Sequence, residues 1–182
     1  MDHIRATVFC IHGNHERRPE TIPTYHTKEF LGGTVYFEPE FPRLVFAVDG
    51  ERYLFDGHTA LVMGGAYSVD KYYRLKNGYH WFPDEQIPED KRLKILDSIR
   101  ANPTVDLVLT HTCPIQWEPT DLFLPFIDQS TVDITTEKFL SDCEKLLNYK
   151  CWLFGHFHTN RAIRDKAIMF FDGVLSYDDL FL

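Results

Sequence analysis

The stretch Ala6-Thr-Val-Phe-Cys-Ile11 runs directly into His12-Gly-Asn-His-Glu16. Two later stretches repeat this arrangement of a short apolar segment followed by histidine: Asp106-Leu-Val-Leu-Thr110 before His111-Thr-Cys-Pro114, and Cys151-Trp-Leu-Phe154 before Gly155-His-Phe-His158. In open α/β sheets, ligand and metal sites lie outside the carboxyl ends of the strands. The three stretches therefore predict three strands whose following residues bring their imidazole groups together in one polynuclear metal site.

Length and composition restrict the class of protein. The 182 residues suit a single domain spanning residues 1–182, and 44% hydrophobic with 25% charged residues is typical of a globular chain. The net charge of −8 argues against nucleic acid as a partner, because nonspecific binding to phosphates needs a basic groove. A phosphorylated substrate stays open, since a bound divalent metal reverses the local field.

The cysteines and the lengths of the apolar runs bear on location. Cys10, Cys113, Cys143 and Cys151 fit no zinc-ribbon or redox spacing, and the sequence does not begin with the apolar core of a secretory leader. No apolar run in the sequence reaches membrane-spanning length. We therefore expect a reduced, cytoplasmic protein with no membrane partner.

Apolar periodicity and turn residues predict alternating strands and helices. Strands are expected over 6–11, 35–37, 44–48, 60–63, 105–110 and 151–154, a broken helical stretch over 19–30, helices after Pro88 and from Thr135, and a hairpin over 161–171. Asp49-Gly50 and Asp56-Gly57 are both hairpin signals, so 44–63 is predicted to form an antiparallel meander. Together these elements predict an α/β sandwich of two mixed sheets flanked by helices.

Two further predictions concern packing. Leu93, Leu96 and Ile99 have the spacing of one helix face, so this face is expected to cover the sheet. The aromatic residues within 72–82 are expected to fill the space between sheet and helices, with a substrate lid as the alternative.

The three histidine stretches resemble the calcineurin-like metallophosphoesterase family. Gly13-Asn14-His15-Glu16, the lone His111 and Gly155-His156-Phe157-His158 match the last three signature blocks of that family, in the family's order. Each block alone is weak, but three in order, each closing an apolar segment, form a specific signal over residues 6–158. The loop 64–71 is also similar to a loop in a bacterial and phage branch of the family. The resemblance implies a metallophosphoesterase-like sandwich and a hydrolase, a phosphatase or phosphodiesterase.

The resemblance also implies a role for each matching side chain. Asn14, His111 and His156 would ligate one metal ion, and His158 would belong to a second. His15 corresponds to the family's catalytic histidine, which contacts the substrate and protonates the leaving oxygen as a general acid.

The implied chemistry explains the residue types. Hydrolysis of a phosphate ester needs an activated water and a clamp for the oxygens that gain charge, and two divalent ions about 3.5–4 Å apart supply both. Imidazole nitrogens and an amide oxygen suit divalent manganese, iron, zinc or nickel. Arg17 is predicted to bind the substrate phosphate, with a solvated surface position as the alternative.

The sequence departs from the family pattern at its start. The family begins with a D-x-H block and a G-D-x-x-D block, whose aspartates include the one that bridges the metals, and neither block precedes Gly13. Asp56-Gly57-His58 matches D-x-H, but it follows the Gly13–Glu16 block and lies where a hairpin turn is expected. Two dications without an anionic bridge repel each other strongly, so we expect at most one metal ion and severely impaired catalysis.

The missing blocks also carry strands. We therefore expect that the domain is truncated at its N-terminus, with Met1 inside a longer domain, and that exposed strand edges favour homo-oligomers. The first hypothesis is a metal-dependent phosphoesterase that hydrolyses a phosphomonoester or phosphodiester with two metals in the full-length form, this chain carrying part of the site. The alternative is a non-catalytic metallophosphoesterase-like module that binds one metal or none and acts through a protein partner.

Overall fold

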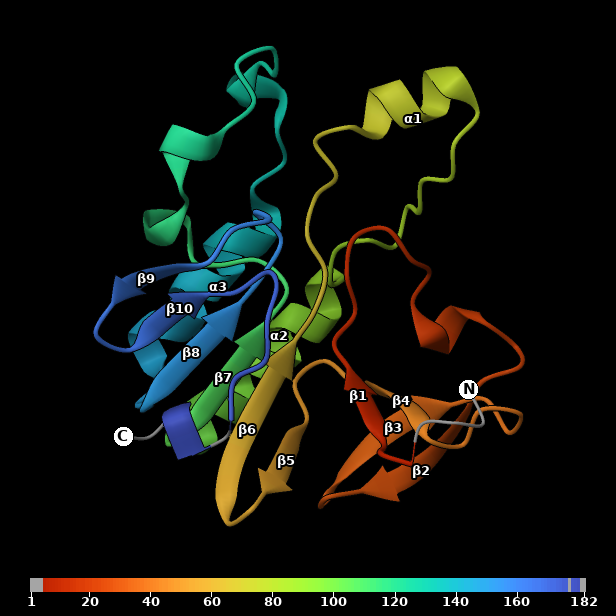
Figure 1. Ribbon diagram of the computed structural model, residues 1–182, viewed down its shortest axis with the longest axis vertical. Coiled ribbons are helices and arrows are strands. Elements are labelled where there is room, and N and C mark those ends of the chain that lie inside the picture. Colours follow the sequence, from red (N-terminus) through yellow and green to blue (C-terminus); the bar gives the residue numbers. More distant parts are fainter. Residues whose placement is uncertain (1–4, 177, 181–182) are drawn as a thin grey trace.

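The structure is a computed structural model that describes residues 5–176 and 178–180. Its strands form two sheets that pack face to face, and helices α2 (Glu89–Ala101) and α3 (Thr135–Leu146) cover the outer face of the larger sheet (Figure 1). Both sheets contain parallel and antiparallel pairs. The predicted α/β sandwich of two mixed sheets flanked by helices is therefore confirmed.

Within the described residues, the smaller sheet has four strands in the order β1-β4-β3-β2. They are β1 (Val8–Cys10), β2 (His26–Phe30), β3 (Gly33–Phe37) and β4 (Leu44–Ala47). Strand β1 runs parallel to β4, and the other pairs are antiparallel. The strand that precedes Asn14 and His15 therefore lies at one edge of this sheet.

The larger sheet, within the same described part of the chain, has six strands in the order β5-β6-β7-β8-β10-β9. They are β5 (Arg52–Phe55), β6 (His58–Met63), β7 (Leu107–Thr110), β8 (Cys151–Phe154), β9 (Arg161–Arg164) and β10 (Ala167–Met169). Strands β6, β7 and β8 are mutually parallel. Their carboxyl ends therefore meet at one edge of the sandwich, where the residues after each strand can form a site.

Alternation along β6 divides the core into two layers. Val62 packs between the sheets with Val35 and Val45, whereas Leu61 and Met63 belong to the cluster beneath α2 and α3. Successive side chains of a strand point to opposite faces, so a strand with both faces covered reads as a continuous apolar run. This explains why the segment 60–63 has no polar position.

Tyr53 joins the two sheets through its hydroxyl. The hydroxyl donates a hydrogen bond to the carbonyl of Thr34 at 2.6 Å and accepts one from the amide of Val48 at 2.9 Å. Both partners belong to the segment 33–48 of the smaller sheet, while Tyr53 lies on β5 of the larger one. The hydroxyl of this buried side chain thus satisfies two partly buried backbone groups.

The remaining elements are short. Helix α1 (Lys71–Asn77) has no buried residue and stands away from both sheets (Figure 1). Five 3-10 turns are found in the described part of the chain: Pro19–Thr21, Ile115–Trp117, Thr120–Leu122, Gln129–Thr131 and Asp178–Leu180. In the described residues, none of the helices combines the length and apolar character needed to span a bilayer. The four cysteines are free thiols.

Two of the predictions for local structure are wrong. Over 19–30 only one 3-10 turn forms, and His26–Phe30 pairs as β2 with β3 instead of continuing as a helix. Asp49-Gly50 does not close a hairpin, because β4 and β5 belong to different sheets. Asp56-Gly57 does close one, between β5 and β6, with positive φ at both residues.

The packing predictions were also incomplete. In α2 the buried face is formed by Ile95 and Ile99, and Leu93 is exposed. Tyr72, Tyr73 and Tyr79 are exposed, so they do not fill a space between sheet and helices. For α2, the helical periodicity shows that the helix has an apolar face, but the tertiary arrangement decides which of two adjacent faces meets the core.

Candidate active site

Backbone hydrogen bonds join the ends of four strands beneath the site. The amide of Gly65 donates to the carbonyl of His12 at 2.8 Å, which links the ends of β6 and β1. The amide of His111 donates to the carbonyl of Met63 at 3.3 Å, and that of Gly155 to the carbonyl of His111 at 2.9 Å. The three histidine stretches are therefore held side by side, as their positions after strands predict.

Asn14, His111 and His156 converge at this edge. The Nε2 atom of His111 lies 2.9 Å from Oδ1 of Asn14 and 3.3 Å from Nδ1 of His156. The two imidazole rings are in edge contact, with centroids 5.1 Å apart. Three potential ligand atoms from three distant segments are thus close enough together to bind one metal ion.

The amide of Asn14 is oriented by Ser68, a residue that the sequence analysis did not single out. Nδ2 of Asn14 donates to Oγ of Ser68 at 3.0 Å, and that hydroxyl donates to the carbonyl of Asn14 at 3.2 Å. Ser68 is fully buried. Because Nδ2 is engaged on this side, Oδ1 faces His111. The sequence offered one signal for this residue, the resemblance of the loop 64–71 to a loop of the family. That resemblance does not indicate which residue of the loop has a role.

The electrostatics keep the imidazoles neutral. Removal from water, together with the neighbouring His156, lowers the pKa of His111 to about 3. Removal from water likewise lowers the pKa of His156 to about 4, with His158 adding to the effect. A neutral imidazole keeps the nitrogen lone pair that a metal ion requires.

The turn that carries Asn14 and His15 is closed by its own residues. Oε1 of Glu16 accepts a hydrogen bond from the amide of Gly13 at 2.6 Å, and Nε2 of His12 donates to the carbonyl of Glu16 at 3.1 Å. The turn also packs closely on the loop after β6, because a Cβ at Gly64 would lie 2.6 Å from the carbonyl oxygen of His12. Glycine is required there by this backbone contact.

His156 and His158 both have left-handed backbone conformations, with φ of 71° and 54°. Such values are uncommon outside glycine and occur at functional sites where the surrounding structure enforces them. His158 is exposed, and its ring packs against Phe171 with centroids 4.9 Å apart. His156 therefore joins the cluster with His111, while His158 lies on the adjoining wall.

His15 is exposed and faces a cation. Its Nε2 lies 3.4 Å from a terminal nitrogen of Arg74, whose Nε donates to Oδ2 of Asp70 at 2.7 Å. Partial burial lowers the pKa of His15, and Arg74 lowers it further. The sequence analysis did not identify Arg74, because α1 was not predicted and nothing local connects residues 15 and 74.

The two arginines after this turn differ in position. Arg17 is exposed and is not among the residues that line the cavity described below. Arg18 is buried, and its guanidinium pairs with Asp49. Oδ1 of Asp49 also accepts a hydrogen bond from the amide of Gly64 at 2.7 Å. Arg18 is thus part of the scaffold that joins the two sheets below the site.

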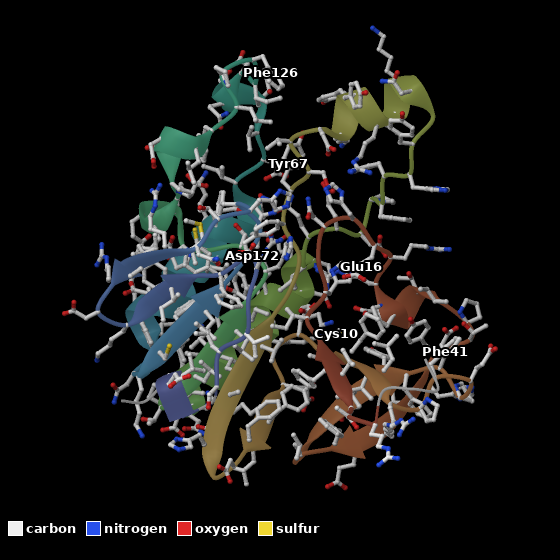
Figure 2. All side chains as sticks on the ribbon, in the orientation of Figure 1. Cys10, Glu16, Phe41, Tyr67, Phe126 and Asp172 are labelled. Atoms are coloured by element: carbon white, nitrogen blue, oxygen red, sulfur yellow. The ribbon has the colours of Figure 1, made fainter. Side chains whose placement is uncertain are left out.

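A cavity of about 930 Å³ opens above the histidine cluster. Its lining includes Asn14, His15, His111, His156 and His158, which are the five residues predicted as ligands or catalytic acid. The segments 67–70 and 118–137 form its other walls; Figure 2 labels Tyr67 on the first of these segments and Phe126 farther out on the second. A volume of this size matches a small organic ligand.

Glu137 contributes a buried carboxyl group to this cavity. It is 5% exposed, and its Oε2 has no hydrogen-bond partner among the described residues. Burial, together with the nearby charges of Glu118 and Asp133, raises the pKa of Glu137 to about 7. The folded protein therefore prefers the protonated carboxyl group.

This shift predicts a pH-dependent stability effect. Between the ordinary pKa near 4.5 and the raised value of about 7, the folded state binds a proton that the unfolded state has lost, so ionisation costs stability as pH rises. Glu137→Gln should therefore be more stable than the wild type by roughly 1–3 kcal/mol at pH 8 and by almost nothing at pH 4, measured by urea unfolding. Asp142→Asn, on the exposed side of the same helix, is the control; a pH-independent difference for Glu137→Gln contradicts the assignment.

The sequence profile described as calcineurin-like phosphoesterase matches residues 1–160. The chain belongs to the calcineurin-like phosphoesterase family. Searches of curated proteins and of solved structures found no match. The match covers the three histidine stretches and both sheets up to β8, so it includes every residue of the cluster and the turn that carries His15.

The metal ions typical of a calcineurin-like phosphoesterase fit these residues only in part. Asn14, His111 and His156 offer three converging neutral donors, which suit one divalent transition-metal ion. Among the residues that the structure describes, no group of three or more His, Cys, Asp or Glu side chains is placed to hold a metal ion. The described side chains therefore do not provide a ligand set for a pair of ions.

The D-x-H match at Asp56-Gly57-His58 is not part of this site. The pair Asp56-Gly57 forms the turn between β5 and β6, and the site lies after the other end of β6. The reading of this tripeptide as a hairpin turn is confirmed, and the turn residues explain its sequence without a metal ion.

Proposed function

We propose that this calcineurin-like phosphoesterase is a metal-dependent hydrolase of a phosphomonoester or phosphodiester. The observation that supports this most is the convergence of Asn14 Oδ1, His111 Nε2 and His156 Nδ1 within 2.9 and 3.3 Å contacts in the lining of a cavity. In the structure, the N–H of His111 can donate to Asn14 Oδ1; with its proton on the other ring nitrogen, Nε2 of His111 joins Asn14 Oδ1 and His156 Nδ1 as a neutral donor atom for one cation. An arrangement of this kind is expected of a metal-binding site.

In this proposal Asn14, His111 and His156 hold one divalent ion, and His158, which lines the same cavity, would belong to a second ion. The first ion is manganese, iron, zinc or nickel, and when bound it polarises the phosphate oxygens and makes water more acidic. Ser68 positions Asn14 by holding its Nδ2.

His15 is proposed to donate the proton to the leaving oxygen. It lines the cavity beside Asn14 and is exposed, so a substrate can reach it. In the ligand-free protein Arg74 disfavours the protonated imidazole. A phosphate bound between the two groups offsets the charge of Arg74, which favours the protonated form that a general acid requires.

The test measures turnover and metal content on the same samples after incubation with Mn²⁺. His15→Ala should keep the metal content of the wild type and lose roughly 10²–10⁴-fold in turnover, the usual contribution of a general acid. The loss should be larger for diphenyl phosphate than for bis-p-nitrophenyl phosphate, because p-nitrophenolate leaves without protonation. His26→Ala, an exposed histidine on β2, is the control and should change neither quantity.

A non-catalytic module is the second candidate, favoured by the lack of a carboxylate in the described ligand cluster. Such a module would show no turnover with either ester, and His15→Ala would leave its properties unchanged. Turnover by the wild type that His15→Ala removes contradicts this second function. Metal binding without any turnover contradicts the first.

A further inference from the structure

The cavity has two walls of different character. The histidine cluster lines one part of it, and the segment 118–134 lines another, which we call the apolar wall. Its hydrophobic members are Leu122, Phe123, Leu124, Ile127, Val132 and Ile134. Several of these side chains remain accessible, with Leu124 46% exposed. Clustered accessible apolar side chains beside a polar cluster are typical of ligand-binding sites.

The charges around the cavity all have one sign. Five acidic residues line it: Glu16, Asp70, Glu118, Asp133 and Glu137. None of the described lining residues is lysine or arginine. A site for nucleotides or other polyanions needs cations along the whole ligand, not only at the reacting phosphate. Arg74 contacts His15 from outside the lining but is already paired with Asp70, so the lining itself supplies no cation for a second negative group.

Two of these carboxyl groups have free oxygens. Oδ1 of Asp70 and Oε2 of Glu137 are buried and have no hydrogen-bond partner in the described part of the chain. The other oxygen of Asp70 is engaged by Arg74. Oδ1 of Asp70 would repel an anionic group placed beside it, and the buried carboxyl group of Glu137 offers such a group no positive charge.

We infer that the cavity takes a phosphate ester of an apolar alcohol, aromatic or aliphatic, whose non-phosphate part carries no negative charge. The inference rests on the proposed function for the phosphate group, which the histidine cluster receives. The apolar wall receives the alcohol, and the acidic residues exclude polyanionic substrates. The volume of about 930 Å³ limits the substrate to a small organic molecule.

The test compares ligands that cannot be hydrolysed, so that binding is measured apart from catalysis. Methylphosphonate and 1-naphthylmethylphosphonate carry the same charged head and differ in the apolar group. Calorimetry on the Mn²⁺-loaded protein should show that the naphthyl compound binds at least about tenfold more tightly. A ring-sulfonated naphthyl analogue should lose most of that advantage, because the sulfonate faces the acidic walls.

Variants of the 118–134 segment provide the matched control. Leu124→Ser and Leu124→Lys should each reduce the ratio of the two affinities by at least about threefold, the lysine variant also restoring binding of the sulfonated analogue. Phe126→Lys makes the same charge change two positions away, at a residue that is 78% exposed and does not line the cavity (Figure 2). It should leave every ratio unchanged.

The outcomes separate this inference from the proposed function. Equal affinities for the two phosphonates, or equal effects of the substitutions at Leu124 and Phe126, overturn the inference even if phosphate esters are hydrolysed. Selective binding of the naphthyl compound without turnover of any ester overturns the proposed function and supports the apolar specificity of the cavity. Selective binding of the naphthyl compound together with hydrolysis of 1-naphthyl phosphate supports both.

Discussion

Asp49→Ala is expected to destabilise the protein by about 3–5 kcal/mol, the cost of removing one partner of a buried ion pair. The side chains of Arg18 and Asp49 are only 3% and 4% exposed, and they bond to each other directly. Oδ1 of Asp49 also accepts a hydrogen bond from the amide of Gly64 at 2.7 Å. The alanine variant would leave a guanidinium in the interior without its counter-charge and an amide without its acceptor.

Equilibrium unfolding in urea measures this effect. Asp49→Asn keeps an acceptor for Gly64 but not the charge, so its loss should fall between those of the wild type and the alanine variant. Asp97→Ala, which removes an exposed ion pair with Arg100 on α2, is the matched control and should cost less than about 1 kcal/mol. If Asp49→Ala costs no more than Asp97→Ala, the pair does not hold the two sheets together.

His111→Ala is expected to weaken Mn²⁺ binding by at least about 100-fold, because a lost metal ligand costs more than the 10–100-fold usual for a residue that only orients one. Nε2 of His111 is the central atom of the cluster, within 2.9 Å of Asn14 Oδ1 and 3.3 Å of His156 Nδ1. Turnover should fall in parallel with metal content, in contrast to His15→Ala.

Calorimetric titration with Mn²⁺ gives the affinities. Ser68→Ala tests the residue that orients a proposed ligand. It removes the hydroxyl that accepts a hydrogen bond from Nδ2 of Asn14, so the affinity for Mn²⁺ should fall roughly tenfold. The control is again His26→Ala, which should bind as the wild type does. Wild-type affinity in His111→Ala would show that the cluster is not where metal binds.

Much of the candidate site was predictable because its signals are local. An apolar run of four to six residues followed by histidine indicates a buried strand and a side chain at its carboxyl end, and parallel strands bring such ends together. The three histidine stretches were grouped in this way, and the family resemblance named Asn14, His111 and His156 as candidate ligands; the structure places these three side chains in contact. The hairpin turn at Asp56-Gly57 was also predictable, since the conformation that this dipeptide favours depends on two residues alone.

The errors and omissions all involve contacts between distant parts of the chain. Asp49-Gly50 has the same local signal as Asp56-Gly57, but the chain crosses between the sheets there, and the carboxyl group of Asp49 is engaged by Arg18, which lies 31 positions away. Asn14 and Ser68 are 54 positions apart. No periodicity or dipeptide preference encodes such a pair.

For this protein, the sequence alone determined the sandwich of two sheets, the family and the grouping of the candidate ligand residues, because strand periodicity, turn chemistry and ordered motifs are written in short segments. The tertiary structure alone decided which side chains orient those ligands and what surrounds them. The apolar wall, the unpartnered carboxyl oxygens and the buried ion pair arise only when separate segments pack together, since burial changes the cost of a charge and the value of an apolar surface.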